Sequence, residues 1–369
     1  MKKPGFRWMV MLLPWAICCG LRAQPAEAVL RVGVAGMSHD HIAFFLHRSD
    51  TTKIRLVGIY EPDRAVAMHY ATLYHLDTSI IYSSLPRMLD AVKPEAVVAF
   101  GSIIDHLSVV EACAPRHIHV MVEKPLATTV TAAVRMQQLA RRYHIFLLTD
   151  YETAWYPSNA KAYQLIVDSD FVGHVRKVVV HDGHEGPREI HVSPQFLSWL
   201  TDPVQNGAGA LFDFGCYGAN LMTWIMGDSR PVAVSAVTRH FKPLEYPKVE
   251  DDATVVLSYP QAECIIQASW DWPFGRKDIE IYGDRGYIIN VDGTTMRLRG
   301  NGMTREETRT ITPGQTGVYT NPFDYFLDVI RGRITVPRNG LYAPDNNVEV
   351  VRILSAARKS AQLQRSVGM

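Results

Sequence analysis

The chain has 369 residues, which is enough for two domains of ordinary size. Hydrophobic residues make up 47% and charged residues 20%, a balance typical of globular proteins that argues against long disordered segments. The formal net charge of +1 excludes a strong overall field that would attract nucleic acid or an anionic membrane surface.

Residues 1–28 have the pattern of a secretory signal peptide. Three basic side chains in residues 2–7 precede an apolar stretch over residues 8–19, which is too short to span a bilayer comfortably. Residues 26–28 fit the A-x-A cleavage pattern, and cleavage after Ala23 is a second possibility. We therefore predict an exported, periplasmic or otherwise extracytoplasmic protein without a stable membrane span after processing. A retained membrane anchor is the alternative.

Removal of this leader leaves three cysteines, Cys113, Cys216 and Cys264. Their number is odd and their spacing is wide, so neither a disulfide framework nor a zinc pattern follows. We expect three thiols, mostly buried.

Apolar strand-like and helix-like segments alternate through residues 29–150. Expected strands cover 29–35, 54–60, 96–100, 118–122 and 145–148, and expected helices cover 42–48, 65–74, 107–114 and 129–143. The third strand is fully apolar, as strands buried on both faces of a parallel sheet tend to be. This alternation predicts a Rossmann-like, doubly wound parallel sheet.

The turn after the first strand matters most, because ligands of such sheets bind beyond the carboxyl ends of the strands. A dinucleotide turn has the pattern G-x-G-x-x-G, and here these positions are Gly36, Ser38 and His41. Ser38 can still donate a hydrogen bond to phosphate, and we include His39 and His41 among the candidate cofactor contacts. On this motif alone, a sheet that binds another ligand or none stays open.

Glu61 ends the second expected strand. A carboxylate there accepts hydrogen bonds from the adenosine ribose hydroxyls and repels a 2′-phosphate. It therefore favours NAD over NADP, although a solvated loop acid is the simpler interpretation of Glu61 taken alone.

Glu123-Lys124-Pro125 follows another buried strand, where the lysine reaches the ligand end of the sheet. Together with the segment 97–106, which ends at His106, and the glycine-rich run 206–220, this stretch resembles the glucose–fructose oxidoreductase / inositol dehydrogenase (Gfo/Idh/MocA) family. The resemblance covers almost all of the chain after the leader.

The resemblance implies that Lys124, Asp213 and Tyr217 are catalytic and that His106 and Glu123 belong to the cofactor site. Tyr217 stands where most members carry His; glucose–fructose oxidoreductase and its closer relatives carry Tyr there, with an Asn at the position of Asn220. A free tyrosine has a pKa of about 10, so Lys124 is expected to lower the pKa of Tyr217, and Asp213 to orient the pair.

The spacing of Asp213, Tyr217, Asn220 and Trp224 places all four on one face of a helix that starts near Asp213. Periodicity alone is equally consistent with a packed amphipathic helix. With the family resemblance, we favour Asn220 as a substrate contact.

Residues 151–369 change character. Expected strands at 175–181, 232–238, 253–259, 264–270, 278–283 and 287–291 alternate apolar and polar residues, which predicts an α+β substrate domain with an open, mainly antiparallel sheet. In the family the open face of this sheet often forms a dimer contact, so a homodimer or homotetramer is expected.

No metal is expected, because no acid or cysteine spacing completes His39-x-His41 or the set His181, His184 and His191. Trp155 and Arg188 are candidate substrate contacts, since sugar rings stack on aromatics and hydroxyls pair with forked donors. Both residues could equally be structural.

Three functions remain. The first is hydride transfer between a tightly bound NAD, or NADP, and a hydroxyl of a sugar, polyol or glycoside. The second is a redox-neutral cleavage in which a sugar carbon is oxidised, a glycosidic bond is eliminated and the carbon is reduced again. The third is a non-catalytic nucleotide- or sugar-binding relative.

Overall fold

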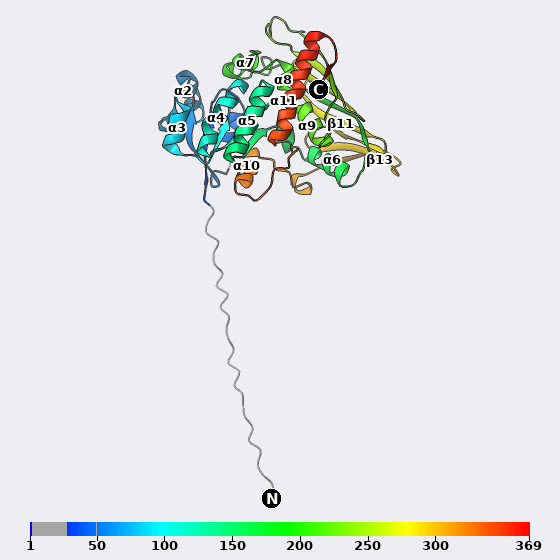
Figure 1. Ribbon diagram of the computed structural model, residues 1–369, viewed down its shortest axis with the longest axis horizontal. Helices are drawn as coiled ribbons and strands as arrows, with labels where there is room; N and C mark the ends of the chain where they lie inside the picture. The colour runs from blue at the N-terminus through cyan, green and yellow to red at the C-terminus, as the bar shows by residue number, and fades with distance from the viewer. Residues whose placement is uncertain (2–27, 49) are drawn as a thin grey trace.

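The computed structural model describes residue 1, residues 28–48 and residues 50–369. The predicted signal peptide lies outside the described residues except at its two ends. Within the described ranges, no helix is both long and apolar enough to cross a membrane. Figure 1 shows one sheet-and-helix layer around α2 to α5, a large sheet around β11 and β13, and α11 between them.

In the described part of the chain, the first sheet has six parallel strands in the order β3-β2-β1-β4-β5-β6. This confirms the predicted doubly wound parallel sheet. Its strands are β1 (Leu30–Ala35), β2 (Ile54–Tyr60), β3 (Ile81–Tyr82), β4 (Ala96–Ala99), β5 (His119–Glu123) and β6 (Leu147–Asp150).

The helices of this half lie between the strands, and side-chain caps fix where several of them begin. Asp63 accepts from the backbone N–H of Ala65 at 2.7 Å, and Thr129 accepts from that of Ala132 at 3.2 Å. The helices are α1 (Ile42–Leu46), α2 (Arg64–Leu73), α3 (Leu85–Val92), α4 (His106–Cys113) and α5 (Val130–Tyr143), with single turns η1 (Thr78–Ile80), η2 (Ile103–Asp105) and η3 (Ala114–Arg116). Sequence analysis missed β3 and α3.

The second sheet has nine strands among the described residues, in the order β14-β13-β12-β11-β7-β10-β9-β8-β15. Only β7 and β10 pair in parallel, so the expected mainly antiparallel sheet is confirmed. The strands are β7 (Val175–Gly183), β8 (Ala233–Arg239), β9 (Asp252–Ser258), β10 (Glu263–Ser269), β11 (Arg276–Gly283), β12 (Gly286–Asn290), β13 (Thr295–Gly300), β14 (Glu307–Thr310) and β15 (Val367–Gly368).

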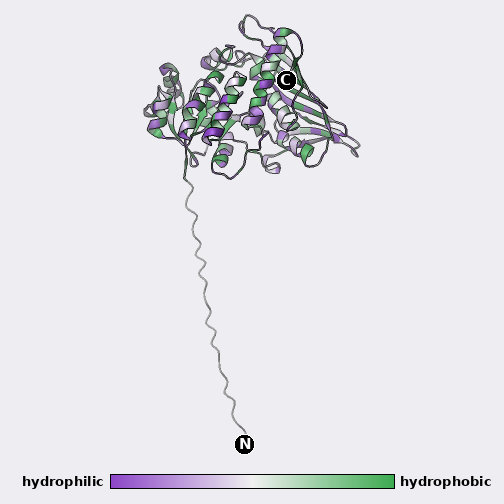
Figure 2. Ribbon diagram, in the orientation of Figure 1, coloured by the Kyte–Doolittle hydropathy of each residue, from purple (hydrophilic) through white to green (hydrophobic). Residues whose placement is uncertain are grey.

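Helices cover one face of this sheet and join it to the first half. The longest, α11, contacts α5 of the first half as well as α9 and β8. Figure 2 shows hydrophilic and hydrophobic residues side by side along α4, α5 and α11, as expected for helices with one buried face. The remaining elements are η4 (Glu152–Trp155), α6 (Pro157–Val167), α7 (Pro194–Leu200), α8 (Ala210–Asp213), α9 (Gly215–Met226), η5 (Pro313–Gln315), α10 (Pro322–Ile330) and α11 (Pro344–Leu363).

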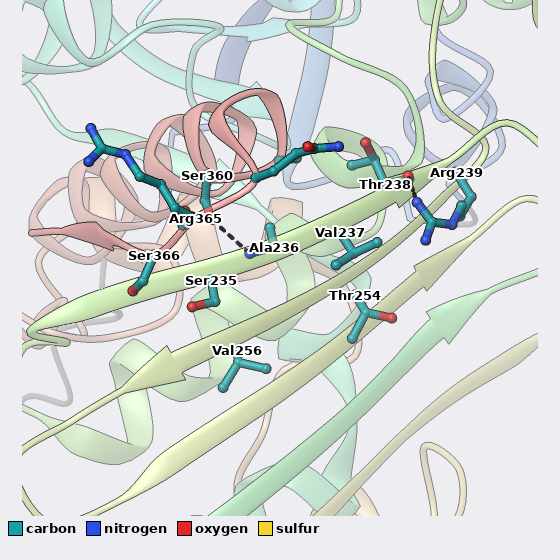
Figure 3. A pocket seen from close by; sticks show the side chains of 12 residues that line it. Ser235, Ala236, Val237, Thr238, Arg239, Thr254, Val256, Ser360, Arg365 and Ser366 are labelled. Atoms are coloured by element: carbon teal, nitrogen blue, oxygen red, sulfur yellow. Dashed lines mark hydrogen bonds between the residues drawn. The ribbon is translucent and has the colours of Figure 1, made fainter.

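A groove runs between the end of α11 and β8, the strand next to the short edge strand β15 (Figure 3). Ser360 of α11 accepts a hydrogen bond from the backbone N–H of Ala236 at 3.0 Å, and β15 covers only Ala233 and Val234. The side chain therefore satisfies one backbone donor that the short β15 leaves unpaired.

Asn220 does not occupy the position expected for a substrate contact. It is fully buried between α9 and α11, where its amide donates to the carbonyl of Leu341 at 2.9 Å and to Asn346 Oδ1 at 3.0 Å. Trp224, one helical turn further on, stacks on Tyr163 of α6. The predicted substrate role of Asn220 is thus corrected to a hydrogen bond that joins two helices.

We expect Asn220→Ala to lower the free energy of unfolding by about 1–3 kcal/mol, because it leaves buried polar groups of Asn346 without their partner. Denaturant titration measures this change. Asn301→Ala, in an exposed turn, is the control and should leave stability almost unchanged. A variant of normal stability that has lost only substrate turnover would restore the substrate role.

Candidate functional site

A cavity opens beyond the carboxyl ends of β1 and β4, where connections leave the first sheet in opposite directions. It brings together residues from four segments that the sequence separates widely. Its lining includes four predicted cofactor residues and others not predicted: Gly36, Ser38, Glu61 and His106, with Tyr60, Pro62, Gly101, Asp105 and Ser108. The cavity is where a doubly wound sheet binds its ligand.

Gly36 provides the close approach of two chain segments at the floor of this cavity. Its φ is +82°, and a Cβ there would lie 2.6 Å from the backbone nitrogen of Gly101. No other residue type fits without displacing the backbone. The first glycine of the expected pattern is therefore required by geometry.

Glu61 ties the end of β2 to the same turn. Its carboxylate accepts from the backbone N–H groups of Met37 at 2.8 Å and Asp63 at 3.0 Å. Burial raises its pKa, although these two hydrogen bonds oppose the rise. Each carboxylate oxygen keeps a free lone pair, which a ribose hydroxyl can use.

His106 tests whether the cavity fits a polar ligand. The ring is fully buried at the start of α4, and Nδ1 bonds the carbonyl of Leu126 at 3.1 Å. Nε2 is buried and has no hydrogen-bond partner within the described residues. Because an unpaired buried polar atom is costly, this nitrogen fits a hydrogen bond from a bound cofactor.

His39, His41 and Glu123 meet at the inner end of the turn. His41 Nδ1 lies 3.2 Å and His39 Nε2 lies 3.9 Å from Glu123 Oε2. His39 also packs on Phe196 and Trp199 of α7, with ring centroids 4.3 and 5.5 Å away. Burial, then neighbouring His41 and Lys124, hold the pKa of His39 well below its ordinary value. His39 is therefore a neutral contact between the two halves.

The expectation that no acid completes the histidine sets is wrong in space. Glu123 joins His39 and His41, and Asp278 and Glu280 join His181, in groups with metal-ligand spacing. A physical argument still opposes a metal at each group. At the first group, His39 Nδ1 accepts a hydrogen bond from the backbone N–H of His41 at 3.1 Å, so the proton of the neutral ring is on Nε2. Nε2 is the nitrogen that points to Glu123, and while it carries the proton it has no lone pair for a metal.

At the second group, Arg276 binds both carboxylate oxygens of Asp278, at 2.6 and 2.9 Å. His181 Nδ1 lies 3.0 Å from the same carboxylate. A metal would have to displace the guanidinium. The other histidines of the predicted set do not join: His184 Nδ1 accepts from the N–H of Gly186, and His191 is exposed.

Lys124 and Asp213 form a buried ion pair between β5 and α8. Lys124 Nζ donates to the carboxylate of Asp213 and, at 3.0 Å, to its backbone carbonyl, while Trp270 Nε1 donates to the second carboxylate oxygen at 2.9 Å. Burial alone would raise the pKa of Asp213 and lower that of Lys124. Their mutual attraction outweighs burial, so the pKa of Asp213 is lowered and that of Lys124 raised.

The predicted single helix from Asp213 is interrupted at Phe214. The carbonyl of Asp213 accepts from Lys124 Nζ and from Cys216 Sγ, while the N–H of Tyr217 donates to the carbonyl of Phe214 instead. The ion pair thus takes over a carbonyl that would otherwise continue the helix. Asp213 and Tyr217 therefore lie on two helices, not on one face of one helix.

Tyr217 is buried beside this pair, with Lys124 Nζ 5.2 Å from its ring centroid. The predicted net lowering of its pKa by Lys124 is not found. Burial, followed by the carboxylate of Glu152, raises the pKa of Tyr217 well above its ordinary value. At neutral pH the phenol is a proton donor.

Sequence analysis missed three polar residues of this region: Glu152, Asp182 and Lys277. Lys277 of β11 pairs with Glu152 of η4, and its Nζ lies 4.7 Å from the Tyr217 ring centroid. Asp182 of β7, opposite Lys277 in the strand register, is buried, and burial raises its pKa well above the ordinary value. Their only signal in the sequence is that each is a polar residue at or near the end of an expected strand.

The other two predicted substrate residues belong to different segments of the chain. Trp155 is half-buried in η4, where its Nε1 donates to Asp150 at 3.0 Å. Arg188 is exposed in the loop after β7, and its backbone N–H donates to the hydroxyl of Tyr246 at 3.1 Å. Their contact with a substrate stays a prediction.

Comparison with known protein families gives two consecutive matches. The model described as an oxidoreductase family with an NAD-binding Rossmann fold matches residues 28–151, and the Gfo/Idh/MocA C-terminal domain model matches residues 161–289. The chain belongs to the Gfo/Idh/MocA family of oxidoreductases. Its first half is thus an NAD-binding Rossmann domain.

Individual relatives are distant. Trans-1,2-dihydrobenzene-1,2-diol dehydrogenase from Sus scrofa is 22% identical over 233 residues, which are 63% of this chain and 65% of that enzyme, just under two thirds of its length. The aldose-aldose oxidoreductase of Caulobacter crescentus, complexed with glycerol, has a TM-score of 0.74 at 22% identity and covers 93% of this chain and 100% of its own.

An inositol dehydrogenase homologue of Azotobacter vinelandii, complexed with NAD+, has a TM-score of 0.78 at 19% identity over 92% of this chain and 97% of its own. At these identities the solved structures show that the fold is shared.

We expect Asp213→Asn to lower the free energy of unfolding at pH 7 by about 3–5 kcal/mol, because it leaves the Lys124 ammonium buried without a counter-ion. The folded pKa of Asp213 lies below its ordinary 3.8, so the contribution of the pair is present above about pH 4 and is lost as the pH falls through the folded value. It is also lost as the pH rises through the raised pKa of Lys124.

Denaturant titration across this pH range measures the difference between wild type and variant. Asp90→Asn, which breaks the surface pair with Arg116, is the control and should cost less than about 1 kcal/mol. Equal losses in the two variants would contradict a buried pair.

Proposed function

We propose that the protein transfers a hydride between NAD and a hydroxyl-bearing carbon of a sugar, polyol or glycoside. One observation carries the proposal. Both hydrogen bonds of the Lys124 ammonium within the described structure go to Asp213, so its third N–H is available beside the phenol of Tyr217. A lysine and a tyrosine held together this way suit a substrate oxygen that changes between hydroxyl and carbonyl.

The cofactor would supply or accept the hydride when bound. Gly36 would let its diphosphate approach the turn, Glu61 would receive the ribose hydroxyls, and His106 Nε2 would gain a partner. Lys124 stabilises negative charge on the substrate oxygen. Tyr217, protonated at neutral pH, gives that oxygen a proton as the carbonyl is reduced, and takes the proton back in the reverse direction.

Glu61 is also the basis for proposing NAD rather than NADP. A carboxylate at the end of β2 repels a 2′-phosphate, and its two backbone hydrogen bonds hold it in place. We further propose that the cofactor stays bound through the catalytic cycle, because an exported enzyme has little free NAD to draw on.

Redox-neutral glycoside cleavage is a second candidate, favoured by Asp182. Elimination of a glycosidic bond from an oxidised sugar needs a proton for the leaving oxygen, which hydride transfer alone does not need. Asp182 is buried near Lys277, its Oδ1 has no partner within the described residues, and burial raises its pKa well above the ordinary value. Export, which the leader predicts, suits an enzyme that meets glycosides outside the cytoplasm.

We also propose a homodimer formed through the uncovered face of the nine-stranded sheet. On β9 and β10 the residues facing the helices are buried, and most alternate residues, among them Val256 and Ile265, are only half-buried, as is Val179 of the neighbouring β7. A row of half-exposed aliphatic side chains on a sheet fits contact with a second copy.

Bound cofactor is the first property to measure. We expect mass spectrometry of small molecules released by denaturing the purified protein to find NAD or NADH. Gly36→Ala, checked for folding by circular dichroism, should be empty, because its Cβ closes the approach to Gly101. A wild-type protein that is empty and also fails to bind added NAD(H) and NADP(H) would indicate a non-catalytic relative.

Turnover tests the chemistry. We expect Tyr217→Phe to reduce hydride transfer about 100-fold or more while NAD binding is unchanged. The readouts are NADH absorbance with sugars and polyols and aglycone release from aryl glycosides. Release without net NADH identifies redox-neutral cleavage. Tyr282→Phe, on the opposite face of the sheet, is the matched control. Equal activity of wild type and Tyr217→Phe would rule out the proposed role of the phenol.

A further inference from the structure

A second lysine faces the ring of Tyr217. Lys277 Nζ lies 4.7 Å from the ring centroid, closer than Lys124 Nζ at 5.2 Å. Lys124 comes from the end of β5 and Lys277 from β11, so the two sheets each contribute one ammonium group to the same phenol. A cation near the ring stabilises the phenolate relative to the phenol.

Glu152 restrains this second ammonium. Its carboxylate pairs with Lys277 and accepts the hydroxyl of Tyr156 at 2.7 Å. The side chains of Lys277 and Glu152 are 23% and 33% exposed, whereas those of Lys124 and Asp213 are 6% and 7% exposed. The pair of Lys277 and Glu152, here called the outer pair, can therefore respond to its surroundings. The pair of Lys124 and Asp213, the inner pair, is buried.

The remaining groups around Tyr217 leave the outer pair as the adjustable one. Asp213 is bound to Lys124 and Trp270, and burial raises the pKa of Asp182 well above its ordinary value, which favours its neutral form. Burial likewise keeps the thiol of Cys216 and the phenol of Tyr151 protonated by raising the pKa of each. The titratable groups around the ring are thus Lys124 after β5, Tyr151 after β6, Glu152 from η4, Asp182 from β7, Asp213 from α8, Cys216 from α9 and Lys277 from β11.

We propose that Glu152 and Lys277 are positioning residues that set how readily Tyr217 releases its proton: Lys277 favours release, and Glu152 opposes it by holding and neutralising Lys277. The inference rests on the proposed function only in that Tyr217 exchanges a proton with the substrate oxygen. No reaction of these two side chains with substrate is required.

The proton affinity of Tyr217 can be measured without a substrate. Carbon-13 NMR of the full protein, labelled at the tyrosine ring, follows ionisation of each phenol, and the Tyr217 signal is the one lost in Tyr217→Phe. A unit charge about 5 Å away in a partly buried site shifts a pKa by about one to two pH units.

We expect Glu152→Gln, which keeps the shape of the side chain, to ionise Tyr217 at a pH about one to two units below wild type. At a fixed alkaline pH its phenolate fraction then rises about 10- to 100-fold. Lys277→Met should ionise at or above the wild-type pH, and Lys277→Arg should restore wild-type behaviour. The double variant Glu152→Gln/Lys277→Met should return close to wild type, because it removes a neutral pair.

Lys177→Met is the matched control, since Lys177 pairs with Glu263 on an exposed part of the same sheet. It should leave the Tyr217 titration unchanged. Titration of Glu152→Gln at or above the wild-type pH would overturn the inference, as would identical curves for Lys277→Met and Lys277→Arg that both lie below wild type.

Bound NAD and turnover are measured on the same samples. Normal NAD content and turnover with an unshifted Tyr217 would defeat this inference and leave the proposed function intact. A shifted Tyr217 in a protein that neither binds NAD nor turns over would defeat the proposed function and leave the electrostatic role of the pair.

Discussion

The buried pair of Lys124 and Asp213 is the contact on which the arrangement of the molecule depends. It joins the end of a parallel strand in the first sheet to the short helix α8, and Trp270, directly after β10 of the second sheet, holds the same carboxylate. Removing two charges from water costs several kcal/mol each, and their mutual attraction offsets that cost only with close contact and further hydrogen bonds. The pair thereby joins the two halves at the carboxyl end of β5.

The same pair shapes the backbone. By occupying the carbonyl of Asp213, the ammonium ends α8, and α9 restarts one residue later with Tyr217 in its first turn. The ion pair therefore influences the phenol of Tyr217 in two ways: it sets where α9 begins, and its charges lie beside the ring. A second ion pair, Lys277 with Glu152, also lies close to the ring, so Tyr217 has two neutral pairs beside it; burial dominates and the phenol keeps its proton.

The periodic elements were predictable, because strand alternation and apolar parallel strands are local properties of the sequence. The two-residue β3 was missed because so short a strand carries no period of its own. The prediction for Asn220 was wrong because helical spacing shows which residues share one face of a helix, but not which neighbouring element that face contacts. Glu152 and Lys277 are 125 residues apart, and no local pattern connects them. Lys124, Asp213 and Tyr217 could be proposed together as catalytic residues only because a family resemblance supplied what spacing lacks.

The incomplete glycine pattern of the first turn can be explained by the role of each position. The first position of the pattern must be glycine to avoid a backbone clash. This chain has Gly36 there, with Gly101 lying against it. The third normally allows the following helix to pack closely. Here α1 is only five residues long, and His41, at that position, precedes it with its ring directed to Glu123. The space that glycine would leave is used to connect the turn to the Glu-Lys-Pro segment. Replacement of the third glycine is therefore compatible with a dinucleotide site, whereas replacement of Gly36 is not.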